Sequence, residues 1–261
     1  MMNIKQNIDI PSFRFAWYYA KSQLKMKYRY TSIGFLWHFL EPAIFLVILS
    51  LIFSVINRMN INDYAVFLFS ALVPWRYFEK TVNTVMESIV NGEWLIKKMY
   101  VSPFAFPINR WIISGFEFFF SMSVAFVIFA LLKENWTIHL LIIPLSTIPW
   151  ALTGMGVGMI AAVLYTFFRD IKPLVQLLLT LTFFTSPILF NRQIFEADSI
   201  QARLMDLHPF TYLAALFQKP VYQMNWPSAN DWIISFSLAV ITLLLGITLI
   251  NRYKSKFYFF L

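Results

Sequence analysis

The sequence predicts an all-α integral membrane protein with six transmembrane helices, an N-terminal amphipathic interfacial helix, and short re-entrant outer helices between spans five and six. Of its 261 residues, 59% are hydrophobic and only 13% are charged, and the mean hydropathy is +0.64. A soluble domain typically has about 25% charged residues. Long apolar runs alternate with short basic clusters, as the positive-inside rule describes. We therefore interpret residues 1–261 as a single transmembrane domain.

The apolar runs define the predicted spans, since a helix needs about 20 apolar residues to cross a bilayer. Five runs meet this length plainly, whereas 64–90 carries Arg76, Glu79, Lys80 and Glu87. If 64–90 crosses, both termini and 16 of the 21 Lys and Arg residues lie on one side. With five spans, the basic clusters after residue 110 would lie on the opposite side. The predicted spans are thus 36–57, 64–90, 111–132, 138–167, 171–190 and 231–250.

The segment 11–30 has the composition of an interfacial helix. Arg14, Lys21, Lys25 and Arg29 fall on one helical face, with aromatic residues beside them. Two compatible interpretations follow: an anchor on the cytoplasmic leaflet, or a basic rim that meets an anionic lipid head group. After this helix, Gly34 and the Glu41–Pro42 pair predict a bend into the first span.

Composition also excludes several functions. The net charge of +8 is explained by membrane orientation, so nucleic-acid binding is disfavoured. The absence of cysteine excludes disulfides and thiol chemistry. The three histidines are too scattered to predict a metal site, and no glycine is followed by lysine, so the chain lacks a phosphate-binding P-loop. Gly154, Gly156 and Gly158 predict close helix packing within a span.

Three connecting segments carry further predictions. Residues 91–107 predict a short cytoplasmic helix that could receive a mechanical stroke from a motor subunit, the alternative being a passive loop. Arg169 and Asp170 are expected to pair with each other or to cap the next helix. Residues 191–230 are too apolar for a solvated linker, so we expect short helices that form an outer gate or a packing cap.

Three stretches resemble a known family. "RYTSIGFLWHFLEP" is similar to the signature that precedes and opens the first span in the membrane subunits of ABC exporters for O-antigen, capsule and teichoic-acid polymers. "FLFSALVPWRYFEKTVNTVMESIVNGEWLIKKMYVSPFAFPI" resembles their second span and cytoplasmic loop, and "LYTFFRDIKPLVQLLLTLTFFTSPILF" resembles a later block. Thr31 and Ile33 depart mildly from the signature. The Glu-Pro ending matches the capsule branch and the Phe-Arg-Asp block the O-antigen branch, which leaves the substrate open.

This resemblance implies a multi-pass permease of the bacterial inner membrane, with both termini cytoplasmic, which exports a lipid-linked, O-antigen-like polysaccharide. It implies a homodimer with two copies of a separate ABC ATPase; ATP and Mg²⁺ bind that partner, and this chain binds no cofactor or metal and is not an enzyme. Capsule, teichoic acid or another glycolipid are alternative substrates. An alternative function is an autonomous channel or ion-coupled carrier, which is disfavoured because the spans have few buried charges and no evident inverted repeat. A glycan or lipid transferase is disfavoured because the sequence shows no acidic or histidine cluster.

The functional residues are predicted in four groups. The candidates for binding the substrate's phosphate head group are Lys25, Lys27 and Arg29. The candidate channel aromatics, which could stack on sugars, are Trp37, Trp75, Tyr77 and Phe78. The candidates for coupling to the ATPase are Glu93, Lys97, Lys98, Met99 and Pro103. The candidate structural or gating residues are Gly34, Glu41, Pro42, Arg169, Asp170 and Pro187.

Overall fold

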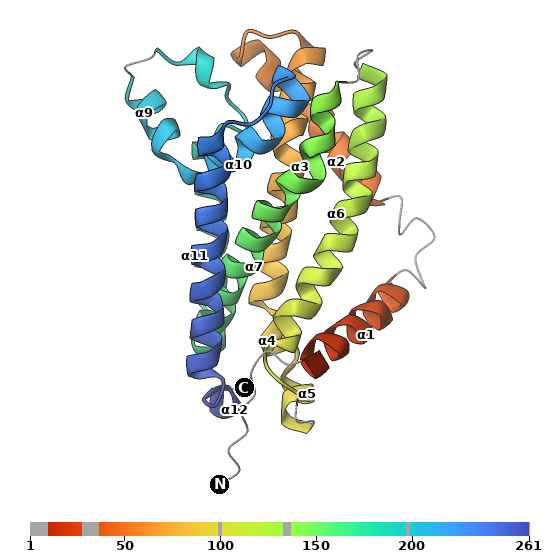
Figure 1. Ribbon diagram of the computed structural model, residues 1–261, viewed down its shortest axis with the longest axis vertical. Coiled ribbons are helices and arrows are strands. Elements are labelled where there is room, and N and C mark those ends of the chain that lie inside the picture. Colours follow the sequence, from red (N-terminus) through yellow and green to blue (C-terminus); the bar gives the residue numbers. More distant parts are fainter. Residues whose placement is uncertain (1–9, 28–36, 99–100, 133–136, 197–198, 261) are drawn as a thin grey trace.

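The computed structural model describes residues 10–27, 37–98, 101–132, 137–196 and 199–260, and every regular element in these ranges is a helix. The long helices run along the long axis of the molecule, while α1 (Ile10–Lys27) lies obliquely across its lower end (Figure 1). The other helices are α2 (Trp37–Ile56), α3 (Ile61–Met86), α4 (Ser88–Asn91), α5 (Glu93–Lys98), α6 (Ala105–Leu132), α7 (Ile143–Phe167), α8 (Ile171–Thr185), α9 (Ile200–Leu207), α10 (Pro209–Gln218), α11 (Ala229–Tyr253) and α12 (Phe257–Phe260).

Shorter helical turns complete the described elements. Two of them are 3₁₀ turns, η1 (Ile138–Ile142) and η2 (Arg192–Ile194), and η3 (Lys219–Gln223) is a π-helical turn. The turns η2 and η3 lie in the segment 191–230 together with α9 and α10, so the prediction of short helices there is confirmed. Their depth relative to a membrane stays a prediction.

Each predicted span contains a helix, and two of these helices have bounds that differ from those of the span. Helix α6 begins at Ala105, six residues before the predicted start, because Pro107 lies in its first turn, where a missing N–H breaks no helical hydrogen bond. Helix α8 ends at Thr185 instead of 190, since Ser186 takes an extended conformation before Pro187. The prediction of one short helix over 91–107 was wrong, because α5 covers only Glu93–Lys98 and residues 105–107 belong to α6.

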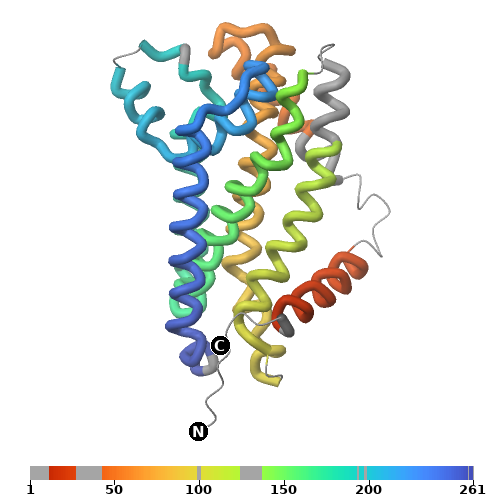
Figure 2. The backbone as a smooth tube through the Cα atoms, in the orientation of Figure 1, coloured from red at the N-terminus to blue at the C-terminus, as the bar shows by residue number. Residues whose placement is uncertain are grey.

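Two of the described helical stretches are long and apolar enough to cross a membrane on their own, Ile138–Phe167 and Ala229–Tyr253. Ala43–Ile56 and Ile61–Met86 meet the criterion only as a pair, and they are bent by 117° at their junction. The apolar helices thus indicate a membrane protein, and the number of spans stays a prediction. Figure 2 shows that α1, α5 and α12 share one end of the bundle, while α9 and α10 lie at the other end.

Glycines bring α7 into close contact with two neighbouring helices. A Cβ atom on Gly156 would lie 2.5 Å from the backbone of Leu243 in α11, and one on Gly158 would lie 2.7 Å from Val85 Cβ in α3. Opposite them, Gly246 of α11 faces Met159 of α7. These separations leave no room for a side chain, which confirms the predicted packing role of the glycine series.

The chain that follows α8 is held by side chains from other helices. The Leu189 carbonyl accepts hydrogen bonds from the Tyr64 hydroxyl at 2.8 Å and from Asn57 Nδ2 at 3.1 Å. The Pro187 carbonyl accepts one from Gln218 Nε2 at 2.6 Å. These bonds satisfy buried carbonyls that no longer belong to a helix, an essential condition in an apolar environment.

The contact at Gly156 gives a test of the α7–α11 packing. We expect Gly156→Ala to destabilise the protein by about 1–3 kcal/mol, because the new methyl group would force the two helices apart. Gly115→Ala in α6 is the matched control: its Cβ would meet only the Tyr77 hydroxyl at 3.9 Å. Thermal unfolding in detergent should separate the two variants, and equal midpoints would contradict the packing account.

Candidate functional site

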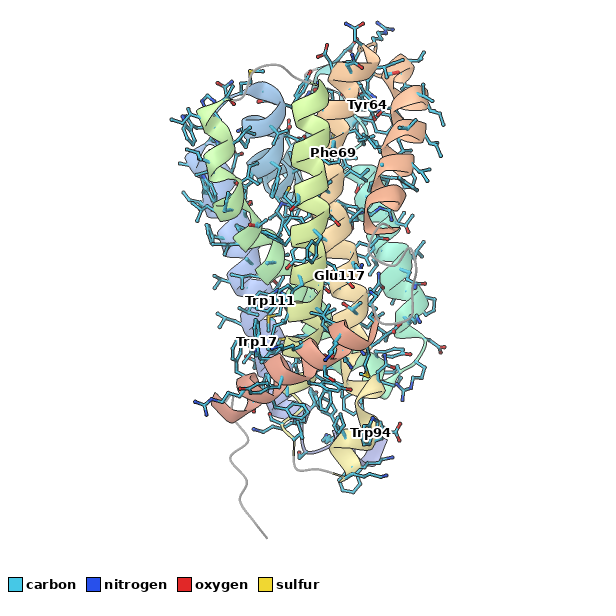
Figure 3. The ribbon with its side chains drawn as sticks, turned by 90° about the vertical axis from the view of Figure 1, so that its right-hand side faces the viewer. Trp17, Tyr64, Phe69, Trp94, Trp111 and Glu117 are labelled. Carbon is cyan, nitrogen blue, oxygen red and sulfur yellow. The ribbon has the colours of Figure 1, made fainter. Side chains whose placement is uncertain are left out.

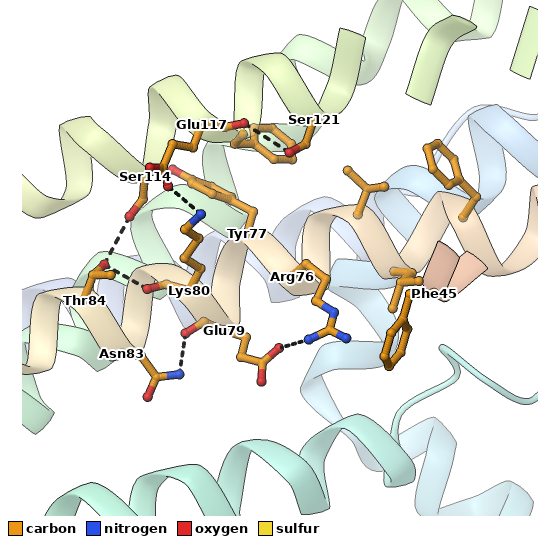
Figure 4. A pocket seen from close by; sticks show the side chains of 14 residues that line it. Phe45, Arg76, Tyr77, Glu79, Lys80, Asn83, Thr84, Ser114, Glu117 and Ser121 are labelled. Carbon is orange, nitrogen blue, oxygen red and sulfur yellow. Dashed lines mark hydrogen bonds and ion pairs between the residues drawn. The ribbon is translucent and has the colours of Figure 1, made fainter. Parts of the chain in front are cut away.

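A cleft runs between α3 and α6 and has a cavity volume of about 400 Å³. Its walls come from one face of each helix, with Phe45 of α2 at one end (Figure 4). The lining residues of α3 are Phe69, Leu72, Val73, Arg76, Tyr77, Glu79, Lys80, Asn83 and Thr84, and those of α6 are Ser114, Glu117, Phe118 and Ser121. The α6 residues recur three and four positions apart, which places them on one helical face.

The centre of the cleft holds a buried carboxylate, Glu117, whose side chain is only 4% exposed. Lys27 Nζ of α1 lies 2.5 Å from its Oε1 atom, and Lys80 Nζ of α3 lies 2.5 Å from its Oε2 atom. A charge at mid-membrane costs on the order of 3 kcal/mol without such partners. Figure 3 shows Glu117 in the middle part of α6, where α1 passes below it. The ion pairs therefore connect three helices at one point.

A smaller cavity of about 180 Å³ adjoins the cleft. It shares Lys80, Thr84, Ser114 and Glu117 with the larger cavity. The remaining lining residues come from α1 and α6: Gln23, Leu24, Lys27, Arg110 and Ile113. Polar side chains thus continue from the cleft to the junction of α1, α3 and α6.

The other half of the cleft is aromatic. Tyr77 of α3 and Phe118 of α6 stack with their ring centroids 4.4 Å apart. The Arg76 guanidinium lies 4.3 Å from the centroid of the Phe45 ring and also pairs with Glu79 at 3.2 Å. Aromatic faces beside fixed polar groups can bind ligands that have both apolar and hydroxylated surfaces.

The structure corrects two of the predicted channel aromatics. Trp75 and Phe78 are each 2% exposed, and both pack against Phe210 in the protein core. They therefore offer no face to a ligand, and the interpretation was wrong for them. Tyr77 lines the cleft, and its role in a channel stays a prediction. The side chain of Trp37 lies outside the described residues.

The predicted head-group lysines are separated. Lys27 lines the smaller cavity and binds Glu117, whereas Lys25 is exposed and lines neither cavity. Arg29 lies outside the described residues. The structure therefore brings Lys27 together with Lys80 and Arg110, which sequence reasoning had not combined with it.

Helix α5 presents a charged and aromatic face at the end of the bundle that also carries α1. Glu93 and Lys97 form an ion pair at 2.6 Å, and Lys98 Nζ lies 5.9 Å from the centroid of the Trp94 ring. Trp94 is 57% exposed (Figure 3), while Leu95 and Ile96 are buried beneath it. Pro103 is buried, and Met99 lies outside the described residues.

The prediction for Arg169 and Asp170 was wrong. The Arg169 guanidinium lies 5.1 Å from the Tyr165 ring centroid, and among the described residues no ion pair joins it to Asp170. Asp170 occupies the N-cap position of α8, but its side chain caps no backbone N–H. An ion pair at 2.7 Å between Lys172 and Glu87 holds this end of α8 instead.

The remaining structural candidates have mixed outcomes. Pro187 has a structural contact through its carbonyl, which accepts from Gln218. Gly34 lies outside the described residues. Glu41 and Pro42 belong to α2, although their side chains are not described. The bend that these three residues predict is therefore untested.

Sequence reasoning missed Glu117, Arg110 and Trp94. A signal existed for Glu117, because it is the lone acidic residue in the apolar run 111–132 and an ionisable residue within a span often marks a functional site. Arg110 was counted only as an inner charge, and Trp94 was passed over in favour of its charged neighbours. Among the described residues, no group of three or more acidic, histidine or cysteine side chains is placed to hold a metal ion.

The segment 191–230 contains a polar network of its own. The Arg192 guanidinium binds both carboxylate oxygens of Asp206 at 3.0 Å, which lowers the pKa of Asp206. His208 caps α10, since its Nδ1 atom accepts a hydrogen bond from the Phe210 backbone N–H at 3.3 Å. Burial lowers the pKa of the His208 imidazole. A neutral ring is required there, because a protonated Nδ1 cannot accept.

The apolar helices and the charged cleft between them define an α-helical membrane protein with a polar site inside its bundle. The chain is 25% identical over 238 residues to the O-antigen export system permease protein RfbA of Myxococcus xanthus, covering 91% of this chain and 92% of that one. It is 26% identical over 247 residues to RfbA of Klebsiella pneumoniae, covering 91% of both. No protein-family model matches. These similarities confirm the resemblance to the permease subunits of polysaccharide ABC exporters.

The His208 cap gives a prediction of pH dependence. The pKa of His208 is lower in the folded protein than in the unfolded chain, so the unfolded chain takes up a proton first as the pH falls below about 6.5. The stability contributed by His208 is therefore complete above that pH and is lost as the pH falls. His208→Asn keeps a capping oxygen that does not titrate. Between about pH 7.5 and about pH 5.5, either side of the ordinary histidine pKa, the unfolding midpoint in detergent should fall further for the natural protein than for His208→Asn.

Proposed function

We propose that this chain is the transmembrane subunit of an ATP-driven exporter that moves a lipid-linked, O-antigen-like polysaccharide across the bacterial inner membrane. Two copies would form the permease, with both termini cytoplasmic, and two copies of a separate ABC ATPase would hydrolyse ATP. The observation that carries the proposal is the polar and aromatic cleft between α3 and α6 in a chain that resembles O-antigen permeases over 91% of its length.

The composition of the cleft supports a glycolipid substrate. Its aromatic half, with Tyr77 stacked on Phe118, suits the C–H faces of sugars, and its polar groups suit hydroxyls. Its charged half adjoins α1, the predicted interfacial helix. A lipid-linked glycan would meet basic residues first and aromatic faces next, and Lys25, Lys27 and Arg29 are proposed to gather its head group.

Helix α5 is the proposed contact for the ATPase. It is a short, rigid element whose buried Leu95 and Ile96 fix it to the bundle. Its exposed face combines an aromatic side chain, a residue type enriched at the centre of protein interfaces, with charges of both signs, which suit the polar rim around such a centre. Force applied to α5 would reach α6 and α7 through α4, which packs against both.

A complementation experiment tests the exporter proposal. In a strain that lacks its O-antigen permease, we expect this chain, expressed with its ABC ATPase, to bring polysaccharide to the cell surface. A hydrolysis-deficient ATPase should abolish this export, because the permease has no energy source of its own. Surface glycan is measured by antibody labelling of intact cells. Export without any ATPase would favour the channel or carrier alternative and contradict the proposal.

A substitution in α5 tests the proposed coupling. Trp94→Ala should reduce co-purification of the ATPase several-fold, since an exposed aromatic anchor is the kind of residue that dominates an interface. Trp226→Ala is the matched control, because Trp226 is similarly exposed at 51% but belongs to the connection between η3 and α11, far along the chain from α5. If both variants retain the ATPase equally, α5 is not the docking element.

A further inference from the structure

The smaller cavity between α1, α3 and α6 has an excess of positive charge. Of the described residues, three basic side chains line it, Lys27, Lys80 and Arg110, against one carboxylate, Glu117. The excess is two positive charges in a partly enclosed space of about 180 Å³. A site of this kind is stable without a ligand only if its cations reach solvent or a counter-ion.

Glu117 already uses both of its oxygens. Each oxygen accepts from one lysine, so the single negative charge of the carboxylate is already shared between two cations. Each ammonium group has three donors and uses one on Glu117. The side chains of Lys27 and Lys80 remain 50% and 40% exposed, so their other donors can reach a ligand in the cavity.

Arg110 is the cavity cation for which the described residues supply no counter-charge. No ion pair or hydrogen bond joins it to another residue of the described ranges. It lies seven residues before Glu117 on α6, about two turns or 10 Å along the same helical face. Its planar guanidinium can bind two oxygens of a phosphate at once, which an ammonium group cannot.

Gln23 adds a polar group to the wall of the cavity. Its Oε1 atom is buried at the edge of the cavity and accepts no hydrogen bond from the part of the chain that the structure describes. Thr84 and Ser114, which also line the cavity, are already bonded to each other at 3.1 Å. A buried amide oxygen without a hydrogen bond lowers the stability of the folded protein, so a hydroxyl group of a ligand, or a water molecule bound beside the ligand, would stabilise it by donating a hydrogen bond.

We propose that this cavity binds the phosphate head group of a lipid through Lys27, Lys80 and Arg110, and that Glu117 acts as an internal competitor which holds the two lysines while the site is empty. A diphosphate carries enough negative charge to offset the cationic excess. The lipid could be the polyprenyl carrier of the proposed substrate or a bilayer phospholipid. The assignment to the carrier rests on the proposed function, whereas phosphate binding itself does not.

If Glu117 competes with the ligand for the two lysines, removing its charge should increase the affinity for the ligand. Glu117→Gln removes a negative charge beside the ligand and frees both lysines, so it should strengthen binding of farnesyl diphosphate by about tenfold. Arg110→Gln and Lys80→Gln should weaken it by about tenfold each. Lys256→Gln, which removes an exposed charge outside both cavities, should leave it unchanged.

Equilibrium binding of radiolabelled farnesyl diphosphate to the purified full chain in neutral detergent measures these effects. Farnesol, which lacks phosphate, should not compete. Competition by phosphatidylglycerol as strong as that by unlabelled farnesyl diphosphate would assign the site to bilayer lipid, and weaker competition would assign it to a polyprenyl carrier. Competition by phosphatidylcholine micelles gives the background level of the assay.

Two results would overturn the proposal: equal affinity for Arg110→Gln and Lys256→Gln, or weaker binding by a Glu117→Gln protein that elutes as a folded species. If Glu117→Gln does not fold, the Arg110→Gln comparison decides alone, and Arg110→Lys should retain part of the affinity. The binding assay requires neither the ATPase nor export activity. A failure of the exporter proposal would therefore appear in the complementation experiment and leave this binding result intact.

Discussion

A carboxylate inside an apolar bundle must be neutralised, and the arrangement of three helices follows from how Glu117 meets that requirement. Lys80 comes from the neighbouring helix α3, and Lys27 comes from α1, ninety residues earlier in the chain. Breaking either pair would leave a buried charge partly uncompensated, which commonly costs about 3–5 kcal/mol. The ion pairs thus fix where α1 lies against the bundle and where the cleft between α3 and α6 is open.

Helix α3 supplies most of the site because its two halves differ. Its first half is packed on nearly all sides, from Tyr64 to Val73. Its second half is buried on one face only, and the other face carries Arg76, Lys80 and Asn83 into the cleft. Such an amphipathic half-helix would be unfavourable against lipid, but it is satisfied where α6 supplies a carboxylate and hydroxyls. The charges that made 64–90 difficult to interpret as a span are therefore the charges of the site.

The helices could be predicted from sequence because hydropathy and basic clustering act over long windows. Their ends could not always be predicted: those of α6 and α8 depend on the local conformation at Pro107 and Ser186. The prediction of two channel aromatics was wrong for a different reason. Trp75 and Phe78 were chosen because they lie near polar residues, but at about 100° per residue Phe78 points away from Arg76 and Trp75 lies to its side, turned toward the core. The partnership of Lys27 with Glu117 joins distant parts of the chain, and no local pattern could have indicated it.

The carbonyls after α8 imply an order of biosynthesis. The partners of the Leu189 carbonyl, Asn57 and Tyr64, are made before it, so that group can be satisfied as soon as the chain emerges. The partner of the Pro187 carbonyl, Gln218, is made later. Until the ribosome has released α10, this carbonyl must rely on water or on the insertion machinery. The outer end of α8 is therefore expected to reach its final position only after translation of α10, as one of the last steps of assembly in the membrane.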